Sequence, residues 1–114
     1  MKFKDTIFWN HYTDYQAVVK ESRMRSTVDA LVLWKLCQFY KFNNILEIGV
    51  HQGLTTGLLL EANPEAKVTG IDPIEKLELL HKHYQKEIKR FTFVRNRSQI
   101  LERALDPGFD CAQK

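Results

Sequence analysis

A short apolar stretch that ends in glycine constrains the fold of this chain more than any other feature. The residues Ile45–Ile48 are mainly apolar, Gly49 ends the stretch, and Gly53 lies four residues further on. A short β-branched and apolar run bounded by glycine is typical of a buried strand in a parallel sheet. We therefore predict a strand over residues 45–48, followed by a connecting loop.

Helical and strand patterns alternate after this loop. A helix is predicted over residues 54–62 and a second strand over 67–71, and a long helix from Ile74 to about Arg90 precedes a third strand over 91–94. The face of the long helix that packs on the body is predicted to consist of Ile74, Leu77, Leu80, His81, Tyr84 and Ile88. Such alternation implies right-handed crossovers and a parallel sheet covered by helices, so the predicted fold class is α/β.

The first part of the chain, residues 1–42, is predicted to be a helical segment. Its aromatic-rich start shows no clear period and suggests a flap or a short helix packed on the body. Ser26 followed by Asp29 has the spacing of a capping box, which predicts that the next helix begins there and runs to Tyr40. The apolar residues of this helix include Leu31, Trp34, Leu36 and Cys37, the last expected in the core.

The second part, residues 43–114, is predicted to form a single compact domain together with the helical segment. A chain of this length can bury one core. Ser98 can cap a short helix that runs to Leu105, and Phe109 and Asp110 can begin a fourth strand, after which few residues remain. The pattern therefore predicts three complete strands, with the alternation of strands and helices stopping at the start of a fourth.

Composition excludes several classes of protein. Cys37 and Cys111 are far apart and belong to no metal-ligand pattern, which argues against a disulfide framework or zinc module and favours a reducing cytoplasm. No apolar run is long enough for a membrane helix. The net charge is +3, and the excess of lysine and arginine lies in the last third of the chain. For these basic residues a solvated helix face is favoured over a patch that binds nucleic acid. His81 and His83 are two residues apart, so no metal site is expected.

The glycine loop is the candidate ligand site. In an open parallel sheet, ligands bind beyond the carboxyl ends of the strands, and glycine there lets a ligand approach the backbone. The alternative is a tight turn that needs glycine for a positive φ. Gly49, Gly53 and Gly57 recur at a spacing of four, which matches neither the GxxxxGK[ST] loop of nucleoside triphosphate sites nor the GxGxxG loop of dinucleotide sites.

The E-x-G-x-x-x-G stretch from Glu47 to Gly53 resembles the first motif of class I S-adenosylmethionine-dependent methyltransferases, and most closely that of small-molecule O-methyltransferases. The resemblance covers roughly residues 43–105. It implies a partial Rossmann-like fold, S-adenosylmethionine as cofactor and a small-molecule methyl acceptor. It also implies that Glu47, Gly49, His51 and Gly53 contribute to the cofactor loop; for His51, filling of a surface loop is the alternative.

Two further residues carry the resemblance beyond the loop. Asp72 follows the second strand and would accept hydrogen bonds from the ribose hydroxyls, although it could equally cap a helix beginning at Pro73. At the end of the third strand the family often has Gly-Asp-Ser or Gly-Asp-Ala, where this chain has Asn96-Arg97-Ser98. Because an arginine cannot accept a hydrogen bond, adenine recognition falls to Asn96 or to a backbone group.

The chain lacks the later strands of this family, from which most acceptor-binding residues come. A methyltransferase is the leading hypothesis, and the alternatives are a non-catalytic module that binds S-adenosylmethionine or supports assembly, and a degenerate fragment. The predicted strands leave one edge of the 45–48 strand without a partner. We expect a second copy or another chain to cover this edge, with residues 109–114 or 3–12 as the alternative cover from within the chain.

Overall fold

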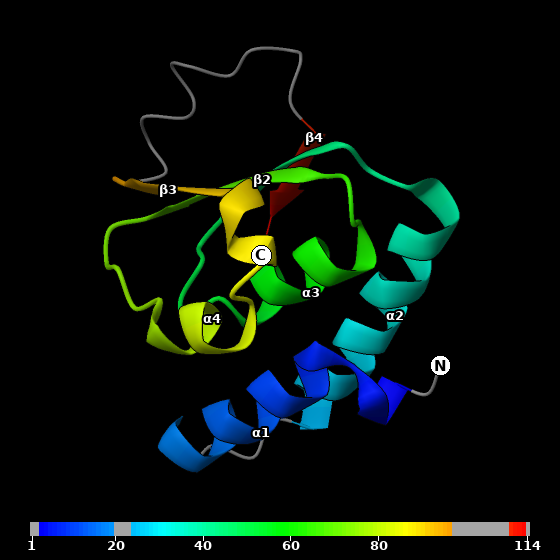
Figure 1. The fold of residues 1–114 in the computed structure, drawn as a ribbon, viewed down its shortest axis with the longest axis vertical. Coiled ribbons are helices and arrows are strands. Elements are labelled where there is room, and N and C mark those ends of the chain that lie inside the picture. The colour runs from blue at the N-terminus through cyan, green and yellow to red at the C-terminus, as the bar shows by residue number, and fades with distance from the viewer. Residues whose placement is uncertain (1–2, 20–23, 97–109, 114) are drawn as a thin grey trace.

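The computed structural model describes residues 3–19, 24–96 and 110–113, and these contain a parallel sheet of four strands (Figure 1). The strand order is β3-β2-β1-β4. The strands are β1 (Asn44–Ile48), β2 (Lys67–Asp72), β3 (Phe91–Arg95) and β4 (Asp110–Gln113). The predicted α/β fold with parallel strands and flanking helices is confirmed.

The helices of the described residues lie mainly on one side of this sheet. They are η1 (Phe3–Asp5), α1 (Ile7–Val19), α2 (Met24–Tyr40), α3 (Leu54–Ala62), α4 (Glu78–His83) and η2 (Glu87–Arg90). The helix α3 connects β1 to β2, and α4 with η2 connects β2 to β3. Figure 1 shows α1 across α3 and α4, on the side of these helices that is away from the strands. The molecule is therefore layered as sheet, inner helices and outer helix.

The strand β1 has a parallel partner on each side. Ile45 lies opposite Val68 of β2 and opposite Asp110 of β4. The edge that we expected a second chain to cover is thus occupied by the end of the same chain, which was the alternative cover. That edge gives no reason to expect a partner, and association with another chain stays a prediction.

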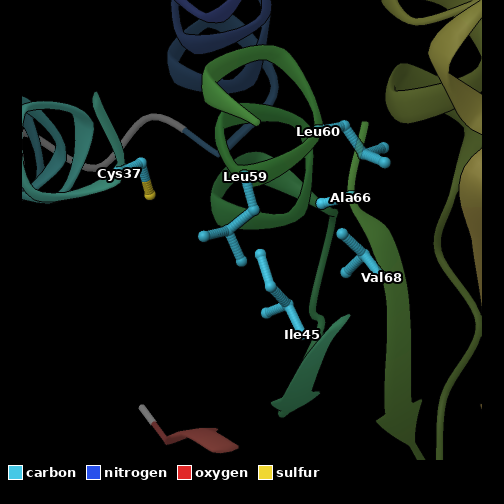
Figure 2. Close-up of a cluster of buried hydrophobic side chains, with 6 residues drawn as sticks. All are labelled: Cys37, Ile45, Leu59, Leu60, Ala66 and Val68. Atoms are coloured by element: carbon cyan, nitrogen blue, oxygen red, sulfur yellow. The ribbon is translucent and has the colours of Figure 1, made fainter. Parts of the chain in front are cut away.

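The core beneath the sheet forms because strand and helix bury apolar side chains against each other. Figure 2 shows Ile45 of β1 and Val68 of β2 directed toward Leu59 of α3, with Cys37 of α2 beside them. All four side chains are buried, and the prediction that Cys37 belongs to the core is confirmed. A second cluster joins α1, α2 and α3 through Phe8, Tyr12, Ala30, Trp34 and Leu58.

The predicted long helix from Ile74 to Arg90 is wrong. The chain forms the six-residue α4, leaves the helix at Tyr84 and then makes the separate 3₁₀ turn η2. Tyr84 is fully buried against the open side of Gly57, where a Cβ would lie 2.2 Å from its ring. Ile74 and His81, both predicted on the packed face, are exposed. A tertiary contact, which periodicity cannot report, therefore decides where this helix ends.

The N-terminal helices also differ from the prediction. The helix α1 is longer than the expected flap, and α2 begins at Met24, so Ser26 lies inside the helix and is not its cap. Trp34 is buried, whereas Leu31 and Leu36 are 41% and 44% exposed. The helix predicted from Ser98 to Leu105 falls outside the described residues. Within the described ranges, no helix has the length and apolar character needed to span a membrane.

Candidate ligand-binding site

The carboxyl ends of three parallel strands bring most of the predicted site residues together. The 49–53 loop follows β1, Asp72 ends β2, and Asn96 follows β3. The backbone N–H of Gly49 donates to the carbonyl of Ile71 at 2.8 Å, and that of Asn96 donates to the carbonyl of Asp72 at 3.1 Å. These bonds extend the sheet pairing past the strand ends and hold the three segments at one edge.

The Asp72 carboxylate organises this edge. One oxygen, Oδ2, accepts a hydrogen bond from the backbone N–H of His51 at 2.9 Å, and Oδ1 accepts one from the N–H of Ile74 at 2.9 Å. The second bond closes a local turn rather than capping a helix, because α4 begins only at Glu78. The helix-cap alternative is therefore not observed. Asp72 instead ties the β1–α3 loop to the end of β2.

The environment of Asp72 favours its charged form. Burial by itself would raise its pKa, since only 6% of the residue is exposed, but the backbone N–H groups of His51 and Ile74, helped by the His51 side chain and the Val50 backbone, together outweigh burial and hold the pKa of Asp72 below its ordinary value. An ionised carboxylate has about four acceptor positions, and two are used by these backbone bonds. The remaining positions can accept hydrogen bonds from a ligand's hydroxyl groups.

The loop between β1 and α3 has an unusual backbone. Gly49, His51 and Gly53 all have positive φ, at 81°, 53° and 79° respectively. This left-handed conformation is costly for residues with a Cβ, which accounts for glycine at two of the three positions. His51 is the one residue of these three that has a side chain, and in this left-handed conformation its N–H donates to Asp72.

The two glycines differ in what surrounds them. A Cβ at Gly49 would meet only the His51 ring, at 3.5 Å from Nε2, whereas a Cβ at Gly53 would lie 3.0 to 3.3 Å from Leu80 of α4. The space at Gly53 thus accommodates a protein side chain. Gly53 therefore lets α4 pack on the start of α3. A role in ligand binding stays a prediction for both glycines.

Glu47 also has a different place from the one expected. Its side chain is fully buried on the helix side of β1, and Oε1 accepts a hydrogen bond from the Thr56 hydroxyl of α3. It lies beneath the loop and does not line the open side. The structure therefore gives Glu47 a positioning role, since it fastens the start of α3 to the strand that carries the loop.

His51 and Asn96 are the exposed members of the predicted set. Both lie at the edge where the loop and the strand ends meet, so their side chains are accessible to a ligand. The backbone N–H groups of both residues bond to Asp72: that of His51 donates to Oδ2, and that of Asn96 donates to the carbonyl.

One residue near the loop was missed by the sequence analysis. His11 of α1 is fully buried, and its ring lies near the backbone of Gln52 in the loop. Sequence pattern gave no signal for this contact, because the two residues are far apart in the chain and the first twelve residues showed no clear period. A cavity of about 260 Å³ also exists, but it lies between the N-terminal residues and α2, lined by Phe3, Thr6, Leu31, Trp34, Lys35 and Gln38.

Comparison with known proteins identifies the fold and nothing finer. No protein-family model matches the chain, and no curated protein matches it. Among solved structures, the crystal structure of cofactor-bound Rv0187 from MTB superposes with a TM-score of 0.71 over 96% of this chain, at 20% sequence identity. The chain spans 53% of the length of that structure. The likeness supports the α/β fold, and that neighbour is a cofactor-bound protein about twice as long.

Proposed function

We propose that this chain binds S-adenosylmethionine at the edge formed by the 49–53 loop, Asp72 and Asn96, and that it serves methyl transfer to a small-molecule acceptor. The observation that carries the proposal is the bond between the His51 N–H and the Asp72 carboxylate. It places an ionised acceptor beside a glycine loop at the ends of neighbouring parallel strands, which is where α/β sheets bind nucleoside-containing ligands.

The residues present fit such a ligand. Asp72 has acceptor positions left for the two ribose hydroxyls, and hydrogen bonds to an ionised acceptor are the stronger kind. A Cβ at Gly49 would meet only the ring of the exposed His51, so the methionine portion could approach the backbone there if that ring moves, and Asn96 lies exposed at the same edge, where the adenine would bind. When bound, S-adenosylmethionine supplies a methyl group already activated by its sulfonium. The protein's part is to hold and orient the reactants.

A non-catalytic module that binds the same ligand is the second candidate. The cofactor-bound neighbour has almost as many residues again beyond the part that this chain matches. The candidate binding edge is contained in the matched part, whereas residues for an acceptor were expected from later strands. Binding without methyl transfer is the outcome that would favour the module.

The test is isothermal titration of the chain with S-adenosylmethionine and S-adenosylhomocysteine. Asp72→Ala should weaken binding of both by about 1.5 to 3 kcal/mol, the range for a hydrogen bond to a charged group. Glu75→Ala is the matched control, because it removes an exposed carboxylate three residues away and should leave affinity unchanged. Absence of heat with either ligand, or equal affinity of Asp72→Ala and the parent chain, would contradict the proposal.

Methyl transfer is tested separately. The parent chain would be incubated with S-adenosylmethionine carrying a labelled methyl group and a panel of small hydroxyl, amine and carbon acceptors. Transfer that disappears in Asp72→Ala supports the enzyme. Tight binding with no transfer to any acceptor supports the binding module.

A further inference from the structure

The imidazole of His11 is the most unusual buried group among the described residues. The residue is 0% exposed, and neither Nδ1 nor Nε2 makes a hydrogen bond of normal geometry, although the backbone of Gln52 is near enough to raise the pKa of the ring. Buried polar groups are normally bonded, and those that are not have an explanation in strain or function. The site proposed above makes no use of His11.

The ring of His11 lies where α1 meets α4 and the glycine loop. It stacks on the ring of His83 with 5.4 Å between centroids and 24° between planes, and it meets the ring of Tyr84 in an edge-on arrangement with 5.9 Å between centroids. The backbone of Gln52 lies on the loop side. One side chain of the outer helix therefore contacts two separate parts of the body.

The charged groups around His11 leave no carboxylate free to neutralise it. Asp14 of α1 accepts hydrogen bonds from Lys82 Nζ at 2.8 Å and from His83 Nε2 at 2.7 Å, so these two side chains already share its carboxylate. These bonds hold the pKa of Asp14 below its ordinary value. From α3, Glu61 lies by the Tyr84 hydroxyl and accepts the backbone N–H groups of Ile7 and Phe8, at the start of α1. The loop contributes the uncharged Gln52.

Protonation of His11 is therefore opposed while α1 is docked. Burial is the main cause and the neighbouring His83 the second, and together they lower the pKa of His11 from 6.5 to about 4, against weaker effects of the Gln52 backbone and Asp14. A released helix would return His11 to its ordinary pKa. Between these two values the released form binds a proton that the docked form does not, so acid favours release and neutral pH favours docking.

The helix α1 can separate without taking the core apart. Among residues whose burial the structure describes, α1 gives no fully buried side chain to the cluster under the sheet or to the one around Val50, Leu80 and Tyr84, and only the partly buried Ile7 packs against the latter. Phe8 and Tyr12 join α1 to the third cluster, which it shares with α2 and α3. Release would expose these two rings and His11, and would leave the sheet and α3 in place.

We propose that α1 is a pH-sensitive strap, which the stacked His11–His83 pair holds on α4 and the 49–53 loop at neutral pH and releases in mild acid. The proposal concerns the chain itself and does not depend on the ligand. From the two pKa values of His11, the ratio of released to docked α1 should rise roughly 30-fold between pH 7.5 and pH 5.

Tryptophan fluorescence and hydrogen exchange test the strap directly. The two tryptophans of the chain, Trp9 on α1 and Trp34 in the cluster beneath it, both report on docking. We expect their emission to shift as the pH falls from 7.5 to 5. Amides of α1 should lose protection, after correction for intrinsic exchange rates, while those of β1 and α3 keep it. Equal loss in all three elements would be global unfolding and would overturn the proposal.

Variants separate His11 from other titrating groups. His11→Phe retains a flat ring that cannot be protonated and should abolish the shift, whereas His81→Gln, which alters an exposed histidine of α4, should leave it unchanged. His83→Gln removes the second cause of the lowered His11 pKa, so it should reduce the change in tryptophan emission without abolishing it. This variant still tests the proposal if His11→Phe does not fold. A transition that persists in His11→Phe, or that is unaltered in His83→Gln, would show that the pair does not control the strap.

Discussion

At the residue scale, the candidate site depends on backbone groups and on one carboxylate. Asp72 connects two strand ends through the N–H groups of His51 and Ile74, so a single side chain sets the loop and remains charged. The spacing of Asp72 after Gly53 could be interpreted from the sequence, since strand ends carry ligand-binding acids in many α/β proteins. That Asp72 also holds the loop required the structure, because the contact spans twenty-one residues.

The two loop glycines provide a matched pair for a stability experiment. Gly49→Ala should destabilise the chain by about 1 to 2 kcal/mol, the cost of a left-handed conformation for a residue with a Cβ. Gly53→Ala carries the same cost and also crowds Leu80, at 3.0 Å, so we expect a larger loss. Urea unfolding of both variants measures the two effects. Equal losses would show that Leu80 yields to the added methyl group at no cost.

At the element scale, the connection from β2 to β3 is governed by contacts with α3. The end of α3 exposes carbonyl groups that its own helix cannot satisfy. The Arg90 guanidinium, at the end of η2, donates to the carbonyls of Leu60, Asn63 and Ala66 at 2.8 to 2.9 Å. A continuous helix to Arg90 was predicted from apolar spacing alone. The helix instead ends at His83, and the ring of Tyr84 is buried against Gly57. The chain then continues to Arg90, whose side chain contacts the end of α3.

Removal of the Arg90 guanidinium should destabilise the whole unit. Arg90→Ala removes the charged donor from the carbonyls of Leu60 and Asn63 at the end of α3 and of Ala66 in the turn that follows, and we expect a loss of roughly 2 to 3 kcal/mol. Arg95→Ala is the control, since this exposed arginine makes a long hydrogen bond of 3.4 Å to the carbonyl of Pro73. Thermal or urea unfolding compares the two. A loss no greater for Arg90 than for Arg95 would argue against the role assigned to this side chain.

At the scale of the whole molecule, β4 gives β1 a partner on its second side. The residues Asp110–Gln113 pair with Ile45–Ile48 in parallel register. A central strand with partners on both sides lacks the unpaired N–H and C=O groups that make an open edge prone to association. The strand that carries the glycine loop therefore has both of its partner strands in this chain. The chain spans 53% of the length of its cofactor-bound structural neighbour.

Deletion of residues 110–114 should open this edge. We expect the amides of β1 to exchange faster and the shortened chain to associate at micromolar concentration, because an apolar strand edge is a template for pairing. Light scattering and hydrogen exchange measure the two effects, and deletion of Lys114 alone, which follows β4, is the control. A deletion variant with unchanged exchange and unchanged mass would show that β4 does not protect β1.

Elements with a local signal could be predicted from the amino-acid sequence. Apolar runs and glycine punctuation located β1, α3, β2 and β3 within a residue or two, and the E-x-G-x-x-x-G spacing located the loop. Tertiary structure alone decided the rest: the end of α4 at Tyr84, the burial of Glu47, the packing of Leu80 over Gly53, and the position of His11 against His83. The physical reason is the range of the interactions. Periodicity and turn preference act between near neighbours in the chain, whereas these four features depend on which distant side chains compete for the same space.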